Sequence, residues 1–185
     1  MELLKLNFEV IPSDVVEIVL DNETPEQHVL RLSSAKSLSL AQLYPEAWII
    51  GADTIVVSDG IIMGKPATRD EAKSMLRKLS GQKHEVYTGI NIRCASAGVC
   101  LSDFLVTKVI FKDIPPEELD SYVMTEEPYD KAGAYALQGM GAFFIREIEG
   151  SYTNVIGLPL CEVVNMLKLA GAIEFSGEMQ DGQVD

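Results

Sequence analysis

The sequence predicts one α/β domain with a mixed, twisted central sheet flanked by helices. Two observations indicate this class. Helical segments with capping signals alternate with apolar, β-branched runs, and no linker rich in Pro, Gly or Ser separates them. The 185 residues are 47% hydrophobic, enough for one well-filled core. We expect the domain to span residues 1–174 and the acidic, glycine-containing residues 175–185 to form a flexible tail.

The first half of the chain predicts two helices around a strand hairpin. Thr24-Pro25-Glu26-Gln27 is a capping box with proline at the first helical position, so a helix begins there. Its expected inward residues are Val29, Leu30, Leu32, Ala35 and Leu38. The composition of residues 47–58 predicts a buried strand. A tight turn at Ser58-Asp59-Gly60 follows, and residues 61–63 are expected to form the second strand of the hairpin. Thr68 with Glu71 predicts a second capping box, and that helix ends at Gly81.

The second half predicts a long strand pair followed by short helices. Residues 85–95 and 99–112 are rich in strand formers and are joined by Ser-Ala-Gly, which favours antiparallel pairing. Pro115-Pro116 starts a short helix, and a polar loop at 125–132 leads into glycine-rich backbone. The last helix begins near Pro159 and stops by Gly171.

Composition excludes several functions. The net charge of −13 argues against a nucleic-acid partner, which needs a basic face. No apolar run approaches the length of a membrane span, and no secretory leader is recognisable. The three cysteines lack metal-site spacing and suit a reducing cytoplasm. His28 and His84 are isolated in the sequence, so we expect surface or packing histidines rather than a zinc site.

Asp53 is the leading candidate for a functional residue. It is the one carboxylate in the apolar run Gly51–Val57, where burial is costly without a metal, a cation or a catalytic task. The expected hairpin carries Lys65 back towards it. The alternative is that Asp53 caps a turn or pairs with one buried base.

Motifs along nearly the whole chain resemble those of the Maf family of nucleoside triphosphate pyrophosphatases, also described as septum-formation inhibitors. They are Gly51-Ala52-Asp53-Thr54, Gly64-Lys65-Pro66, Leu79-Ser80-Gly81, Tyr87-Thr88-Gly89, Glu127 to Tyr135, Leu137-Gln138-Gly139 and Gly150 to Leu160. The resemblance implies a Maf/ITPase-like fold, a cytoplasmic homodimer and a nucleoside triphosphate substrate. The segment Asp130-Lys131-Ala132-Gly133 to Gln138 resembles the branch that acts on dTTP and UTP, and departs from the branch associated with 7-methyl-GTP.

The resemblance also implies roles for single residues, with Mg²⁺ or Mn²⁺ as cofactor. Asp53 is the expected general base and a metal ligand. Glu17 follows a short strand expected at residues 8–10 and is the second carboxylate expected near the metal and substrate. Lys65 and Lys36 are expected to contact phosphate oxygens. The bare sequence leaves simpler alternatives open, namely that Glu17 is a solvated loop residue and Lys36 an exposed helix lysine.

Thr54 and Gln138 correspond to family positions linked to base choice. A side-chain amide both donates and accepts, which suits the O4 and N3–H edge of uracil or thymine. Without the resemblance, Gln138 would be interpreted as an amide that stabilises its loop. Asp130 and Lys131 are interpreted as a structural ion pair framing the pocket.

Family members begin with a short strand and a Ser-x-Ser-Pro-Arg-Arg loop followed by Glu-Leu-Leu. This sequence starts at Met1-Glu2-Leu3-Leu4, so we expect the strand and phosphate loop to be missing from it. We expect one of two explanations, that the start codon was assigned too far downstream or that the chain is a shortened paralogue, and we favour the first because the later motifs are intact. The second case leaves open an alternative function, a noncatalytic nucleotide-responsive regulator of cell division.

Overall fold

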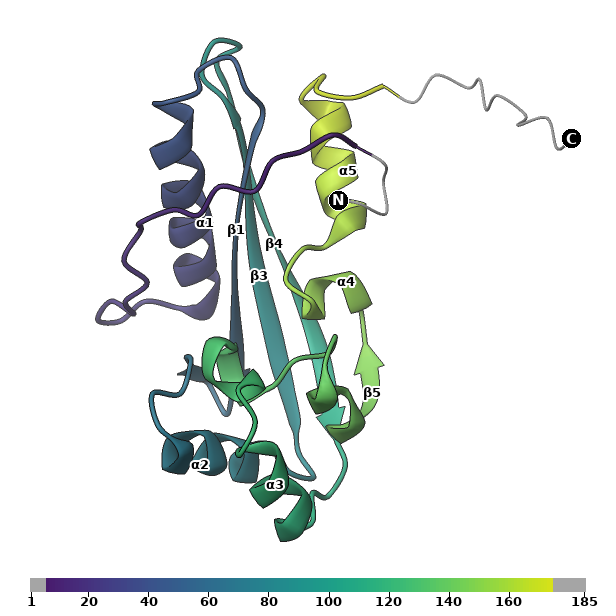
Figure 1. Ribbon diagram of the computed structural model, residues 1–185. Coiled ribbons are helices and arrows are strands. Elements are labelled where there is room, and N and C mark those ends of the chain that lie inside the picture. The colour runs from purple at the N-terminus through teal and green to yellow at the C-terminus, as the bar shows by residue number, and fades with distance from the viewer. Residues whose placement is uncertain (1–5, 175–185) are drawn as a thin grey trace, which may run out of the picture.

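Five strands form one antiparallel sheet in the order β2-β1-β3-β4-β5 across the described residues (Figure 1). The structure is a computed structural model that describes residues 6–174, so the predicted tail at 175–185 and the sequence start at 1–5 lie outside it. The strands are β1 (Ile49–Ser58), β2 (Ile61–Met63), β3 (Lys83–Cys94), β4 (Val99–Phe111) and β5 (Ile145–Glu149).

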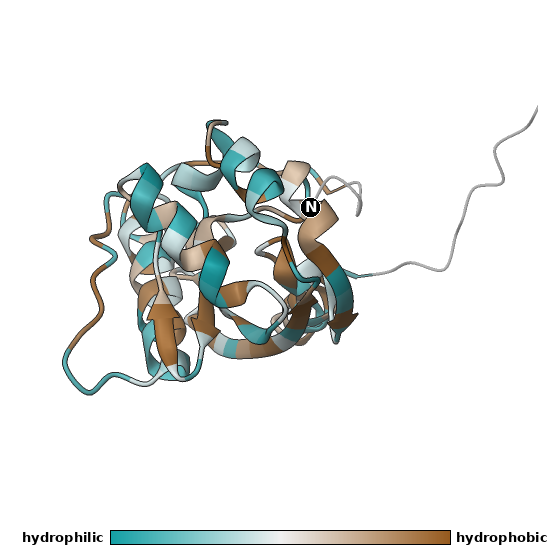
Figure 2. Ribbon diagram, turned by 90° about the horizontal axis from the view of Figure 1, so that it is seen from below, coloured by the Kyte–Doolittle hydropathy of each residue, from teal (hydrophilic) through white to brown (hydrophobic). Residues whose placement is uncertain are grey.

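Helices cover both faces of this sheet, which confirms the predicted α/β class. The sheet is antiparallel throughout the described residues rather than mixed as predicted, because tight turns join β1 to β2 and β3 to β4, and β1 and β5 also pair antiparallel with their neighbours. They are α1 (Pro25–Ala41), α2 (Arg69–Leu79), α3 (Pro116–Tyr122), α4 (Tyr152–Val155) and α5 (Leu160–Leu169), with short 3₁₀ helices η2 (Glu127–Asp130), η3 (Ala132–Ala134) and η4 (Met140–Phe144). Helix α1 packs on the face that carries Ile55 and Val57, whereas α2, α3 and α5 pack on the opposite face. Viewed along the strands, the sheet is mostly apolar and much of the helical surface is hydrophilic (Figure 2).

The structure has neither helix nor strand at residues 8–10, so the strand expected there is wrong. The other predicted helices and strands agree with the structure within about two residues. The capping box at Thr24 is present in full, and the hydroxyl of Thr68 accepts a hydrogen bond from the Glu71 amide. Strand β5 and the single turn α4 were not predicted. Both are short, and β5 is held by its pairing with β4, a long-range contact that a local pattern does not show.

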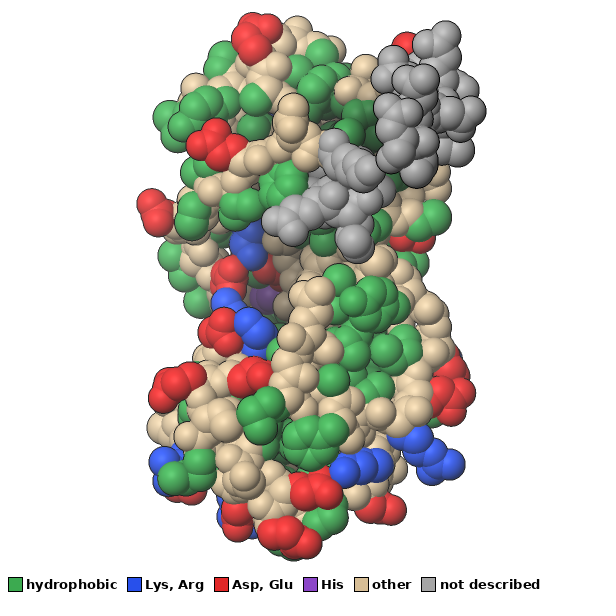
Figure 3. All heavy atoms as spheres, turned by 45° about the vertical axis from the view of Figure 1, so that its right-hand side comes forward, with side chains coloured by type: hydrophobic (Ala, Val, Ile, Leu, Met, Phe, Trp, Pro, Cys, Tyr) green, Lys and Arg blue, Asp and Glu red, His purple; other side chains and the backbone are tan. Residues whose placement is uncertain are grey.

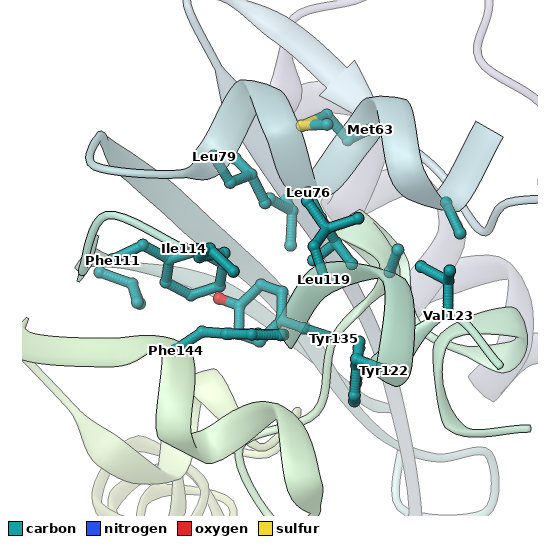
Figure 4. Close-up of a cluster of buried hydrophobic side chains, with 14 of the residues drawn as sticks. Met63, Leu76, Leu79, Phe111, Ile114, Leu119, Tyr122, Val123, Tyr135 and Phe144 are labelled. Carbon is teal, nitrogen blue, oxygen red and sulfur yellow. The ribbon is translucent and has the colours of Figure 1, made fainter. Parts of the chain in front are cut away.

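The main core lies between the lower half of the sheet and helices α2 and α3 (Figure 4). Its aromatic side chains include Phe111, Tyr122 and Phe144, all at most 1% exposed. His84 is buried among them, where its Nε2 lies 2.8 Å from the Tyr135 hydroxyl and burial lowers its pKa to about 4. His28 is buried as well, so both histidines pack inside the protein.

Helix α1 lies unusually close to the sheet because two glycines face it. A Cβ atom at Gly51 would overlap the Ser33 carbonyl oxygen, and one at Gly89 would overlap the carbonyl of Val29. Small side chains on α1 match this approach, since Ser33 and Ser37 are fully buried.

The expectation that Leu38 points inward is wrong. Leu38 is 44% exposed, because the serine side of α1 is the one turned to the sheet. The burial of the serines could not be predicted from hydrophobic periodicity, because this face of the helix carries small side chains rather than apolar ones.

The structure also bears on the expectations for the cysteines and for membrane-spanning segments. The three cysteines are unpaired, with Cys94 buried and Cys100 and Cys161 exposed. Among residues 6–174, no helix is long and apolar enough to cross a membrane.

We predict that Gly51→Ala lowers the free energy of unfolding by about 1–3 kcal/mol, the usual cost of overpacking. The new methyl group would meet the backbone of α1, which cannot move away as a flexible side chain could. Urea unfolding measures the change. Gly64→Ala is the matched control, because its Cβ would meet nothing within 4 Å, and it should stay within about 0.5 kcal/mol of the wild type. Equal stability of the two variants would contradict the close packing of α1.

Candidate active site

Four of the residues predicted from the sequence meet beside β1: Glu17, Lys36, Asp53 and Lys65. The ammonium nitrogen of Lys36 lies 2.7 Å from Asp53 Oδ1 and 2.6 Å from Glu17 Oε1. Lys65 Nζ lies 3.1 Å from Glu17 Oε2. Figure 3 shows side chains of both charges gathered where the surface is hollowed at the waist of the molecule.

Asp53 is buried in the middle of β1, on the face covered by α1. Its side chain is 6% exposed, and one of its oxygens, Oδ1, accepts from Lys36. The other oxygen, Oδ2, is buried and has no hydrogen-bond partner within residues 6–174. Asp53 therefore pairs with a basic residue, which was the alternative to a functional role considered from the sequence. It nevertheless retains one oxygen that can accept a proton or a cation.

Lys36 joins the two carboxylates from α1. Its side chain is 19% exposed, which excludes the alternative of a solvent-exposed helix lysine. Burial alone would lower the pKa of Lys36, but the hydrogen bonds to Asp53 and Glu17 outweigh it and raise the pKa. Lys36 is therefore a charged ammonium at neutral pH.

Glu17 lies between the two lysines. Burial alone would raise the pKa of this half-exposed carboxyl, but the hydrogen bonds to Lys36 and Lys65 lower it overall. Lys65 is more open to solvent, with 55% of its side chain exposed, and is free to turn towards an incoming anion.

Glu17 belongs to a segment, residues 6–23, that has neither helix nor strand; we call it the N-terminal strap. The strap begins near α5, where Leu6 packs, and runs past β1 to the start of α1 (Figure 1). Directly after Glu17, the Ile18 carbonyl accepts a hydrogen bond from Arg31 of α1, 2.9 Å long.

A second set of contacts fixes the end of the strap. Glu23, whose side chain is 6% exposed, accepts two hydrogen bonds from Arg31 of 2.6 and 2.8 Å and lies 2.9 Å from His28 Nδ1. Glu23 also accepts from the Leu20 amide at 3.2 Å. The Arg31 hydrogen bonds are the main cause that lowers the pKa of Glu23 to about 2. The contacts of Glu23 with His28 and Arg31 were not predicted from the sequence. A signal was present, since Glu23 directly precedes the helix cap and the two basic residues lie one helical turn apart.

A cavity of about 300 Å³ opens between the strap, α1 and β1. Its walls are Ile11, Ser13, Glu17, Lys36, Leu40, Ile50, Gly51 and Ala52. In the described part of the chain, residues 49–55 of β1 pair only with β3, so the other edge of this stretch faces the cavity region. Unpaired backbone groups at a strand edge supply hydrogen bonds to a ligand.

Thr54 lies on the opposite face of β1 from Asp53, because side chains alternate along a strand. Its hydroxyl lies 2.9 Å from that of Thr88 and 3.5 Å from the Gly157 carbonyl oxygen. The structure therefore does not bring Thr54 into the charged group around Asp53.

Gln138 is exposed on the loop between η3 and η4. Glu127 holds the end of that loop through the amides of Met140 and Gly141, each at 2.8 Å. The segment also meets the Lys65 loop, since the Gly133 amide donates to the Gly64 carbonyl at 3.1 Å.

Asp130 and Lys131 form an exposed ion pair of 2.7 Å on the segment that precedes this loop. The ion pair itself is present as expected from the sequence, and its role in framing a pocket stays a prediction.

The side chains fit a divalent cation that brings its own phosphate ligands. No group of three His, Cys, Asp or Glu side chains among residues 6–174 could hold a metal alone. Asp53 and Glu17 supply two carboxylates, and Asp53 Oδ2 is an unused acceptor. Mg²⁺ is commonly bound by one or two carboxylates together with substrate phosphates, which matches this donor set.

The sequence model of the Maf family, described as Maf-like protein, matches residues 1–170. The chain belongs to the Maf family. It is 52% identical over 181 residues to a dTTP/UTP pyrophosphatase of Syntrophus aciditrophicus, covering 98% of this chain and 88% of the relative. A protein of the same name from Geotalea uraniireducens is 50% identical over 91% of this chain and 87% of its own. One from Clostridioides difficile is 40% identical over the same shares.

We predict that Arg31→Gln loosens the strap of this Maf protein. The buried Glu23 carboxylate would lose its main partner, and the Ile18 carbonyl would lose its donor. Amide hydrogen exchange in the strap should become at least about tenfold faster through local opening. Arg77→Gln removes the same charge from an exposed position on α2 and should leave the strap unchanged. Similar exchange in both variants would show that the arginine does not anchor the strap.

Proposed function

We propose that this Maf protein hydrolyses dTTP and UTP, or modified pyrimidine triphosphates, to the monophosphate and pyrophosphate in nucleotide metabolism. The names of relatives at 40–52% identity support this substrate class. The single structural observation that carries it is the buried Asp53, with a free oxygen, beside Lys36, Glu17 and Lys65.

The proposed reaction begins with a water molecule that gives its proton to the Asp53 carboxylate. The water oxygen then attacks the α-phosphorus of the nucleotide. The bond between this phosphorus and the oxygen that leaves with pyrophosphate breaks. Lys36 and Lys65 neutralise phosphate charge as it shifts to the leaving group. Asp53 and Glu17 would hold Mg²⁺ or Mn²⁺, which when bound lowers the pKa of water and polarises phosphate oxygens.

The base is proposed to be selected by Gln138, with Thr54 a second candidate. Gln138 supports this role because it is exposed on a loop tied to the Lys65 loop through Gly133 and Gly64. Thr54 would act through the opposite face of β1, next to Gly157.

For assembly and location, we propose a homodimer in the cytoplasm that binds neither nucleic acid nor a membrane. The dimer rests on the family resemblance. The net charge of −13 supports the absence of a nucleic-acid partner.

We predict that Asp53→Asn lowers turnover of dTTP by about 10²- to 10⁴-fold, the usual loss when a general base is removed. The asparagine keeps the shape but accepts no proton at this position. Pyrophosphate release with Mg²⁺ or Mn²⁺ measures the effect, and circular dichroism checks the fold.

The matched control is Asp59→Asn in the exposed turn at the end of the same strand, which should keep full turnover. Near wild-type rates for Asp53→Asn would refute the base assignment. A wild-type protein that releases no pyrophosphate would instead favour the noncatalytic regulator.

We predict that Gln138→Glu lowers kcat/KM for dTTP and UTP. The expected decrease corresponds to a loss of at least ~1 kcal/mol in the free energy of transition-state binding. The change keeps the volume of the side chain but replaces a donor with a charged acceptor facing the base. Measuring kcat/KM for dTTP, UTP, CTP and GTP tests it, with the exposed Gln82→Glu as charge-matched control. An equal loss for all four nucleotides would make Gln138 a scaffold residue.

A further inference from the structure

The Lys36 ammonium occupies the place between the two carboxylates that are proposed to hold the cation. It lies 2.7 Å from Asp53 Oδ1 and 2.6 Å from Glu17 Oε1, so one positive group binds both acids. A divalent ion shared by the same two carboxylates would have to displace this ammonium or share their oxygens with it.

We propose that Lys36 is a displaceable lock on this cation site. In the free protein its ammonium closes the site against metal, and the site opens when a triphosphate offers Lys36 another anionic partner. The inference rests on the proposed function and adds to it an order of events, in which the cation binds together with the nucleotide rather than before it.

Charge balance is the first argument for the lock. Asp53 and Glu17 are offset by Lys36 and Lys65, so the four groups sum to zero. A divalent cation entering alone would give this half-buried group an excess of positive charge, which is costly where water is partly excluded. The triphosphate brings the negative charge that removes this penalty.

The geometry of the two lysines is the second argument. Lys36 is mostly buried and touches both acids, whereas Lys65 is 55% exposed and touches Glu17 only. Displacing Lys36 without a new partner would leave a buried ammonium unpaired. Lys65 faces no comparable penalty, so the two lysines should affect cation binding differently.

The free oxygen of Asp53 is the third argument. Oδ2 is buried and has no hydrogen-bond partner in the described residues, although Oδ1 is filled by Lys36. The lock is therefore incomplete, and Asp53 keeps an acceptor ready for the cation. A salt bridge with a purely structural role would be expected to use both oxygens of so deeply buried a carboxylate.

The test measures Mn²⁺ binding to the nucleotide-free protein by electron paramagnetic resonance of the free ion. Lys36→Gln removes the competing charge while its amide can still donate to Asp53, and it should bind Mn²⁺ at least about tenfold more tightly than the wild type. Lys65→Gln removes the same charge from the same cluster and should change the affinity by less than about threefold. Adding Asp53→Asn to Lys36→Gln should abolish the gain.

Two outcomes would overturn the lock. One is equal Mn²⁺ affinity in the wild type and Lys36→Gln, with both shown to be folded by thermal unfolding. The other is an equal gain in Lys65→Gln, which would mean that net charge alone controls the affinity. Lys36→Met is the second variant if the glutamine form does not fold.

A measurement on the unaltered protein is independent of any variant. Mn²⁺ alone should leave its melting temperature nearly unchanged, whereas Mn²⁺ with an α,β-methylene analogue of dTTP should raise it beyond the analogue alone. An equal rise with Mn²⁺ alone contradicts the lock. None of these measurements uses turnover, so a failure of the proposed pyrophosphatase activity is detected separately, by pyrophosphate release.

Discussion

The contact of the Lys36 ammonium with Asp53 and Glu17 is the interaction on which the site depends. It joins three parts of the chain that are distant in sequence, namely helix α1, strand β1 and the N-terminal strap. The contact forms only because α1 lies close to the sheet over Gly51 and Gly89. A larger side chain at either glycine would push the helix outward and separate the ammonium from Asp53.

The same contact makes the cluster electrically neutral within an acidic protein. The whole chain carries a net charge of −13, but the cluster itself balances two acids with two lysines. Mutual hydrogen bonds raise the pKa of Lys36 and lower that of Glu17, so both stay charged at neutral pH. The neutral cluster therefore adds no negative charge of its own to the field of the chain, and salt screens the more distant charges beyond about 8–10 Å.

The strap reaches the cluster through Glu17, and the segment that leads to Gln138 contacts the neighbouring Lys65 loop through the hydrogen bond from the Gly133 amide to the Gly64 carbonyl. Arg31 and Glu23 tie the strap to α1, which places Glu17 between the lysines. Glu127 holds the loop that follows Gln138 through backbone amides. In both places a carboxylate with a lowered pKa accepts hydrogen bonds from backbone amides outside the central sheet, at Leu20 in the strap and at the start of η4.

The order of the main elements and the candidate catalytic carboxylate could be predicted from the amino-acid sequence, because caps, turns and a lone Asp53 in an apolar strand are local signals. Which charges meet could not be predicted, because it depends on the packing of distant segments. The contact between Lys36 and Glu17 spans unrelated segments, and the anchoring of the strap by Arg31 requires a long-range bond to Ile18. Tertiary packing also turned Leu38 to solvent, since helix α1 presents its serines where the backbones approach. Local patterns record what each residue prefers, whereas pairing and close approach depend on where the rest of the chain places its neighbours.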